Sequence, residues 1–323
     1  MKLKNILVLF LTVMFSLTAV QGQSKKINVE IAYEDGYNFF IANDLGRNGY
    51  YKQKDVARVM GEYADSDDVG LEFIVAAGDT HHWGGVESVH DPLWMTNFEL
   101  IYDHPSLRDP WYPILGNHEY QGNTQAVIDY SNISRRWEMP DRYYTVEVLP
   151  EDEEEAEEFS TAEVFFIDTT PLISSYHEEG NKYIDIHKQD STKQLRWLEG
   201  QLASSTAEFK IVIGHHPIYV SEKKRVDEQD LVQKLDPLLR NYDVALYVAG
   251  HSHTFQHLKK DGSDVNYVVN SSGSLAREPI QGPDTEFCSS DEGFSVVSIG
   301  KNKMKMTFIN YLGDPIYQFE IVK

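Results

Sequence analysis

Short apolar runs that each end in a polar cluster recur along this chain, and they constrain its fold more than any other feature. Runs of this length without polar alternation are typical of strands that other layers cover on both faces. The runs occupy residues 37–44, 71–79, 111–119, 162–170, 209–217 and 244–253. Segments with helical spacing lie between them, at residues 52–64, 191–204 and 228–242. Strands that alternate with helices predict an α/β fold.

The last part of the chain follows a different pattern. Its apolar and polar residues alternate more strictly at 265–272, 294–300, 303–310 and 315–322. Such alternation favours antiparallel strands. No linker rich in Pro, Gly or Ser divides the chain. We therefore expect one domain over residues 23–323, an α/β fold of the α+β sandwich type in which two mixed β-sheets pack together and are flanked by helices.

Residues 1–22 have the features of a secretory signal peptide. Lys2 and Lys4 precede an apolar run, and small residues follow it. The alternative is an uncleaved anchor, which the shortness of the apolar run disfavours. Cys288 is the only cysteine, so an exported chain would have no internal disulfide. We expect a periplasmic or secreted bacterial protein without a stable membrane anchor.

The charge of the chain limits its partners. The formal net charge is −22, and removal of residues 1–22 takes away two lysines and lowers it to −24. Such a surface repels nucleic-acid backbones and anionic membranes, so we expect no nucleic-acid partner. Part of the excess lies in the acidic run at 151–158, which we interpret as a solvated loop. The sequence gives no indication of the oligomeric state.

The polar clusters at the ends of the apolar runs contain the residue types that bind metals. In open α/β sheets, sites are built just beyond the carboxyl ends of the strands. Carboxylate, amide and imidazole groups together suit zinc, manganese or iron. Their number suits two ions about 3.5–4 Å apart that share a bridging carboxylate. The residues in these positions are Asp44, Asp79, Asn117, His118, His215, His251 and His253.

The motifs resemble those of the calcineurin-like metallophosphoesterases. They read DLG at 44–46, GD at 78–79, GNHE at 116–119, GHHP at 214–217 and GHSH at 250–253. The first of them is similar to the Asp-x-Gly motif of the tartrate-resistant purple acid phosphatases. The resemblance implies a metallophosphoesterase fold and a metal-dependent hydrolase of small phosphate esters. It also implies attack on phosphorus by a hydroxide that two metal ions generate.

The resemblance also implies a role for each motif residue. Asp44 and His253 would bind the first metal, and Asp79 would bridge both metals. Asn117, His215 and His251 would bind the second metal. His118 would face the substrate as a general acid or a phosphate-binding group.

The chain departs from the purple acid phosphatases at His82. These enzymes carry a tyrosine three residues after the bridging Asp, and its phenolate binds ferric iron and gives the purple colour. His82 stands there instead, so we predict that it is a ligand of the first metal. A neutral imidazole favours a divalent first metal such as zinc, manganese or ferrous iron. His81 is one residue out of this register, and we interpret it as a loop residue or a neighbour of the ligands.

Two further features leave alternatives open. Residues 218–228 lack the histidine that related enzymes use to protonate the leaving group. Lys223, Lys224 and Arg225 occur there instead, either to bind a distal phosphate or carboxylate or as a solvated cluster. Glu119 either orients His118 or faces solvent at the start of a helix. The sequence identifies no other substrate-binding residue.

Three functions fit these motifs. We expect a phosphomonoesterase with two metal ions drawn from iron, zinc or manganese. A phosphodiesterase, nucleotidase or pyrophosphate-cleaving enzyme would use the same centre, because surrounding loops set the preference for the leaving group. A non-catalytic binding protein on a decayed scaffold is the third possibility, and the complete set of ligand residues argues against it.

Overall fold

The computed structural model describes residues 25–66, 69–150, 155–223 and 226–323. The expected signal peptide, Lys224 and Arg225 lie outside these residues, as does the first half of the acidic run. Within the described part of the chain, no helix is long and apolar enough to cross a membrane.

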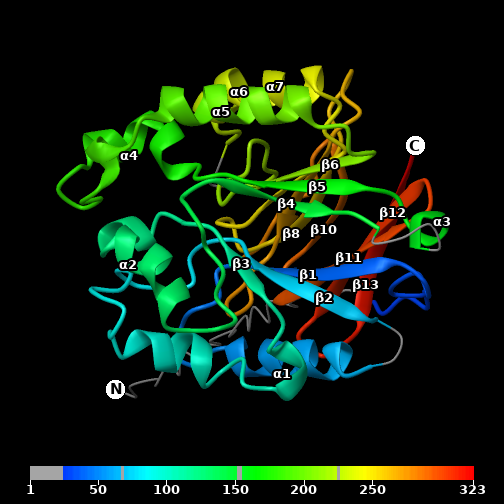
Figure 1. The fold of residues 1–323 in the computed structure, drawn as a ribbon, viewed down its shortest axis with the longest axis horizontal. Helices are drawn as coiled ribbons and strands as arrows, with labels where there is room; N and C mark the ends of the chain where they lie inside the picture. Colours follow the sequence, from blue (N-terminus) through cyan, green and yellow to red (C-terminus); the bar gives the residue numbers. More distant parts are fainter. Residues whose placement is uncertain (1–24, 67–68, 151–154, 224–225) are drawn as a thin grey trace, which may run out of the picture.

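Two mixed sheets form the centre of the molecule (Figure 1). The six-stranded sheet has the order β13-β12-β11-β1-β2-β3. Its parallel part contains β1 (Tyr37–Ala42), β2 (Leu71–Ala76) and β3 (Trp111–Pro113). Its antiparallel part contains β11 (Gly293–Gly300), β12 (Lys303–Asn310) and β13 (Pro315–Val322).

The seven-stranded sheet has the order β10-β8-β9-β7-β6-β5-β4. Its parallel strands are β5 (Ala162–Phe166), β6 (Phe209–Ile213), β7 (Leu246–Ala249) and β9 (Asn266–Asn270). Antiparallel strands complete both sides, namely β4 (Tyr144–Val148), β8 (Phe255–Leu258) and β10 (Thr285–Ser289). The sequence analysis did not identify these three strands.

Helices cover the outer faces of both sheets (Figure 1). Helix α1 (Gln53–Ala64) lies below the first sheet and buries Val56, Val59 and Met60. Over the second sheet lie α5 (Ser191–Ser204), α6 (Gln229–Lys234) and α7 (Asp236–Asn241). The remaining α-helices are α2 (Thr124–Asp129), α3 (Glu155–Glu158) and α4 (Ser174–Glu178). Shorter helical turns occur at 95–99, 105–107, 119–121, 130–132, 170–172 and 186–188.

The facing sides of the two sheets form the core. Phe255 of β8 stacks on Phe308 of β12, with ring centroids 4.7 Å apart. The Ser295 hydroxyl of β11 donates a hydrogen bond to Asn270 of β9. The predicted arrangement, two mixed sheets packed together and flanked by helices, is confirmed.

The expected helix over 228–242 is divided into α6 and α7. Pro237 lies in the first turn of α7, where its missing N–H cannot continue the hydrogen bonds of α6. Helix α5 begins at Ser191, where the helical spacing of the sequence also begins. Asp190 caps this helix, because its carboxylate accepts a hydrogen bond from the Lys193 N–H at 3.0 Å.

Candidate metal centre

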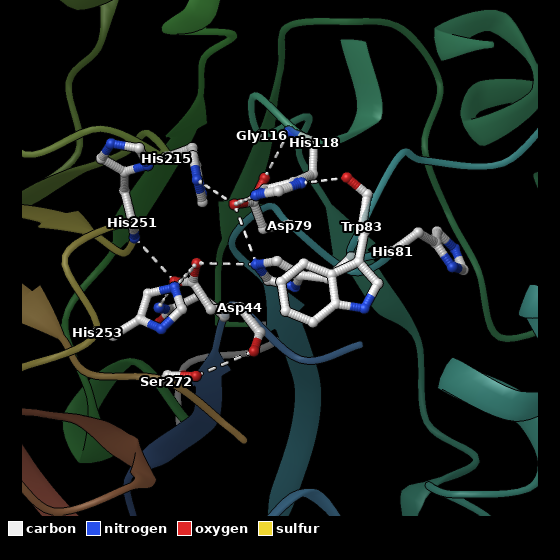
Figure 2. Close-up of polar contacts among 12 residues, drawn as sticks. Asp44, Asp79, His81, Trp83, Gly116, His118, His215, His251, His253 and Ser272 are labelled. Carbon is white, nitrogen blue, oxygen red and sulfur yellow. Dashed lines mark hydrogen bonds and ion pairs between the residues drawn. The ribbon is translucent and has the colours of Figure 1, made fainter. Parts of the chain in front are cut away.

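The parallel strands of both sheets bring the sequence motifs together. In the first sheet, Ala42 pairs with Ala76, and Ala76 pairs with Pro113, so the loops after β1, β2 and β3 leave the sheet side by side. In the second sheet, Ile213 of β6 pairs with Val248 of β7. Figure 2 shows that side chains from both sets of loops converge.

Four of the motif residues have left-handed backbone conformations. The φ angles are 51° at Asp44, 52° at Asp79, 66° at His251 and 60° at His253. Residues other than glycine rarely adopt this region, although Asp and His do so more readily than most. Such conformations persist where the surrounding structure enforces them, and they concentrate at functional sites. Here they mark the sharp turns that follow β1, β2 and β7.

Asp44 lies at the centre of the first group of side chains. Its Oδ1 is 2.9 Å from the His253 Nε2 and 3.9 Å from the His82 Nε2. All three side chains are almost completely buried. The ligand atoms of this group lie within 4.8 Å of one another, which is compact enough for one metal ion.

Asp79 lies at the centre of the second group. Its Oδ2 is 3.1 Å from the His215 Nε2, 3.5 Å from the His82 Nε2 and 3.9 Å from the His118 Nε2. Asp79 and His215 also form a compact group with Asp44. The carboxylate of Asp79 therefore belongs to two overlapping groups, which share His82 and Asp44 with the first group.

Two of the imidazoles are oriented by backbone carbonyl groups. The His215 Nδ1 donates to the Ala77 carbonyl at 3.0 Å, and the His253 Nδ1 donates to the Leu275 carbonyl at 2.7 Å. In a neutral ring this leaves the Nε2 lone pair directed at a carboxylate oxygen. Two acceptors at about 3 Å repel each other unless a proton or a cation lies between them.

Several candidate ligands have buried side-chain nitrogen or oxygen atoms without a hydrogen-bond partner, which supports a metal site here. Among the described residues these atoms include the Asp44 Oδ1, the Asn117 Oδ1 and the His215 Nε2. Burial lowers the pKa of His215, but the carboxylates of Asp79 and Asp44 outweigh burial and raise this pKa to about 10. Buried carboxylates and imidazoles with free lone pairs are the donor set that zinc, iron and manganese bind.

His118 and His251 also lie at the centre, and Asn117 is buried with an Oδ1 that has no hydrogen-bond partner. The His251 N–H donates to the Asp44 Oδ2 at 2.8 Å, and its ring lies 5.3 Å from the His215 ring. The His118 N–H donates to the Asp79 Oδ1 at 2.9 Å, and the His118 Nδ1 contacts the Trp83 carbonyl at 2.6 Å. The His118 side chain is 23% exposed, so it borders both the buried ligands and solvent.

The sequence profile of the calcineurin-like phosphoesterases matches residues 37–255. The chain belongs to this family. It is 32% identical to purple acid phosphatase 17 of Arabidopsis thaliana, over 90% of this chain and 86% of that protein. It is 31% identical to tartrate-resistant acid phosphatase type 5 of Rattus norvegicus, over 77% of this chain and 78% of that protein.

Solved structures agree with this assignment. The structure described as "GAP50 the anchor in the inner membrane complex of Plasmodium" has a TM-score of 0.75 and 26% identity, and the match covers 89% of each chain. The predictions of a metallophosphoesterase related to the purple acid phosphatases, and of a metal-dependent phosphatase, are confirmed at the level of the family.

Glu119 has a role in this calcineurin-like phosphoesterase that sequence reasoning missed. Its carboxylate is 1% exposed and accepts hydrogen bonds from three backbone N–H groups. The donors are Asp79 at 2.9 Å, His81 at 3.0 Å and Gly116 at 2.7 Å. The solvent-facing interpretation is therefore wrong, and within the described residues no hydrogen bond joins the Glu119 carboxylate to the His118 ring. Glu119 ties the GD loop to the GNHE loop.

His81 lies apart from the carboxylate groups (Figure 2). It is fully buried, and burial lowers the pKa of its imidazole to about 3. Its ring packs edge-on against the Trp94 ring, with the ring centroids 4.3 Å apart. The His82 Nε2 instead lies 3.5 Å from the Asp79 Oδ2 and 3.9 Å from the Asp44 Oδ1. The two adjacent histidines therefore have different surroundings, and the assignment of His82 as a metal ligand stays a prediction.

His216, the second histidine of GHHP, also lies at this phosphoesterase centre. Its Nδ1 bonds the Thr169 hydroxyl and its Nε2 bonds the Tyr176 hydroxyl, each at 2.8 Å. The centroids of the His216 and His251 rings are 4.4 Å apart. The doubled histidine was the only sequence signal for this contact. Lys223, the one described member of the basic cluster, is exposed.

Proposed function

We propose that this chain is an exported phosphatase that hydrolyses phosphate monoesters at a centre of two metal ions. The observation that carries the proposal is that buried carboxylates and imidazoles form several overlapping groups, each compact enough to hold a metal ion. The similarity to purple and tartrate-resistant acid phosphatases supports monoesters as the substrates. The pattern of residues 1–22 supports export, followed by one domain over 23–323.

Each ion would have its own set of ligands. Asp44, His82 and His253 would hold the first ion. Asn117, His215 and His251 would hold the second, with Asp79 shared by both. Bound here, the ions would acidify a water molecule and neutralise the charge that develops on the phosphoryl oxygens.

His118 supports the departure of the leaving group. Hydrogen bonding of its Nδ1 to the Trp83 carbonyl turns its Nε2 toward Asp79 and the centre. As water oxygen bonds to phosphorus, the bond from phosphorus to the ester oxygen breaks. A proton on the His118 Nε2 would pass to that oxygen, so that an alcohol leaves and neutral imidazole remains.

The direct test is turnover of p-nitrophenyl phosphate by the purified mature chain. We expect hydrolysis after loading with manganese, iron or zinc, and loss of hydrolysis after chelation. Hydrolysis of bis(p-nitrophenyl) phosphate is expected to be slower, and the reverse order would favour a phosphodiesterase. If no metal supports hydrolysis of any monoester, the proposal is wrong.

A non-catalytic role is the second candidate, because the similar solved structure is described as an anchor of the inner membrane complex. The two roles differ in what the centre must do. A binding scaffold retains its fold without turnover at any metal loading, whereas a phosphatase shows turnover that follows metal content.

A further inference from the structure

One pocket contains every exposed tyrosine and tryptophan of the described residues. Tyr50 is 71% exposed, Tyr51 is 58% exposed and Trp83 is 65% exposed. With Arg47 and Asn48 they line a pocket of about 400 Å³. Isolated exposed aromatics are common on protein surfaces, but a cluster of this kind usually marks a binding site.

The pocket adjoins the candidate metal centre. Trp83 directly follows His82, and their ring centroids are 6.4 Å apart. The Trp83 carbonyl contacts the His118 Nδ1 at 2.6 Å, and its indole lies at the edge of the cluster around Asp44 and Asp79 (Figure 2). The organic group of an ester whose phosphoryl group lies on this centre would therefore reach the pocket.

Arg47 carries positive charge between the centre and the aromatic rings. Its guanidinium lies 4.8 Å from the Trp83 ring and 5.8 Å from the Tyr51 ring. The residue is 4% exposed, and its Nε and Nη1 have no hydrogen-bond partner. Within the described part of the chain, Arg47 forms no ion pair. A buried cation of this kind is costly unless an anion approaches it, and a phosphate ester brings one.

The loop that carries Arg47 and the tyrosines is fixed in place. The Gln53 Oε1 accepts hydrogen bonds from the N–H of Arg47 at 3.0 Å and of Gly49 at 2.7 Å. The Gln53 Nε2 in turn donates to the Asn97 carbonyl at 2.9 Å. Tyr51 has a φ of 55°, so its backbone is held in a conformation that a tyrosine rarely adopts. Rigid aromatic groups bind with little loss of conformational entropy.

We propose that Arg47, Tyr50, Tyr51 and Trp83 form a subsite for the organic group of the substrate, and that this group contains a planar ring. The ring stacks on the exposed aromatic faces, while Arg47 attracts the phosphoryl end. Aryl phosphates and nucleoside monophosphates share this chemistry. The proposal rests on the phosphatase function above and adds a substrate class to it.

Equilibrium binding tests the subsite without turnover. Phenylphosphonate and methylphosphonate present the same anionic group with and without a ring. We expect the metal-loaded protein to bind phenylphosphonate more tightly, and Trp83→Ala to reduce this preference by roughly 5- to 100-fold, the range that loss of one ring stacking costs. Trp83→Phe should restore most of the preference. Leu100→Ala, a variant at an exposed apolar position outside the pocket, should not change it.

Turnover gives a second readout. In Trp83→Ala, the ratio of kcat/KM for phenyl phosphate to that for glycerol phosphate should fall by a similar factor. Competition by adenosine monophosphate distinguishes a nucleotide preference from a preference for small aryl esters. Equal binding of the two phosphonates, or a ratio that Trp83→Ala leaves unchanged, would overturn the subsite.

The two proposals fail in different ways. If no ester is hydrolysed but the ring preference depends on Trp83, the phosphatase function is wrong and the pocket still binds rings. If esters are hydrolysed without a ring preference, the subsite is wrong and the phosphatase function stands. Self-association or vesicle binding that Trp83→Ala abolishes, with no ring preference, would assign the patch to docking and overturn the proposal.

Discussion

At the residue scale, Glu119 shows how one buried carboxylate positions several candidate ligands. Its three hydrogen bonds connect the backbone of Asp79 and His81 to Gly116, which precedes Asn117. Gly116 itself lies against Asp79, where an added Cβ would be only 2.2 Å from the Asp79 Oδ1. The spacing between the GD and GNHE loops therefore depends on the three hydrogen bonds of Glu119 and on the close approach of Gly116 to Asp79.

Replacing Glu119 by Gln should weaken this connection. The amide NH₂ group cannot accept the N–H bonds that the carboxylate accepts, so buried N–H groups lose partners. We expect a loss of about 1–3 kcal/mol in the free energy of unfolding and a decrease of roughly 10–100-fold in metal affinity. Denaturant unfolding and metal titration measure both. If the variant changes only the pH profile of kcat and neither of these quantities, Glu119 acts on His118 instead.

His82 should determine which kind of ion occupies the first metal site. It should also determine the colour of the protein. Its imidazole lies in the group with Asp44 and His253 and replaces an anionic phenolate by a neutral donor. We predict that the iron-loaded chain shows no visible phenolate-to-iron band and that His82→Tyr acquires one. An absorption spectrum measures this. A purple preparation of the unaltered chain would contradict the assignment of His82, and His81→Tyr serves as the control without a band.

At the element scale, the site depends on where parallel strands end rather than on any single loop. The polar residues after β1, β2, β3, β6 and β7 were predicted to meet because carboxyl ends of parallel strands share one edge. The structure brings these residues together. Strands β4, β8 and β10 were missed because they are antiparallel additions at or near the sides of a sheet, and their sequences show no uniform apolar run.

Asp168, just after β5, should make stability depend on pH. Burial raises the pKa of its carboxyl to about 7, against the opposing effect of Arg142 and of the Tyr120 hydroxyl that donates to it. The folded state thus holds a proton that the unfolded chain releases near pH 4. The free energy of unfolding should therefore decrease as pH rises from about 4 to 7. Asp168→Asn should flatten this slope in denaturant titrations, and an unchanged slope would contradict it.

At the scale of the whole molecule, the sequence predicted the layers and most of the candidate centre. Patterns of hydrophobicity specify which faces are buried, and the motif residues carry their chemistry in their side chains. Glu119 and Arg47 could not be assigned, because their roles depend on which backbone groups and rings surround them after folding. The same limit applies to Gln53, whose amide fixes the loop beside the centre.

The net charge of −22 also acts at this scale. An acidic protein repels an anionic substrate unless positive charge is concentrated at the site. Bound metal ions would provide that charge, and the buried Arg47, whose charge interacts with Asp44 and Asp79, adds to it. Hydrolysis by this chain, as proposed, therefore depends on two bound cations.

Metal content per chain, measured together with phosphatase activity, tests that claim most directly. The chain as proposed binds two ions and hydrolyses p-nitrophenyl phosphate in proportion to its metal content. Asp79→Asn should bind less than two ions per chain and lose more activity than the roughly 10–100-fold that loss of an outer partner of a ligand costs. Two ions and unchanged hydrolysis in Asp79→Asn would contradict the central claim.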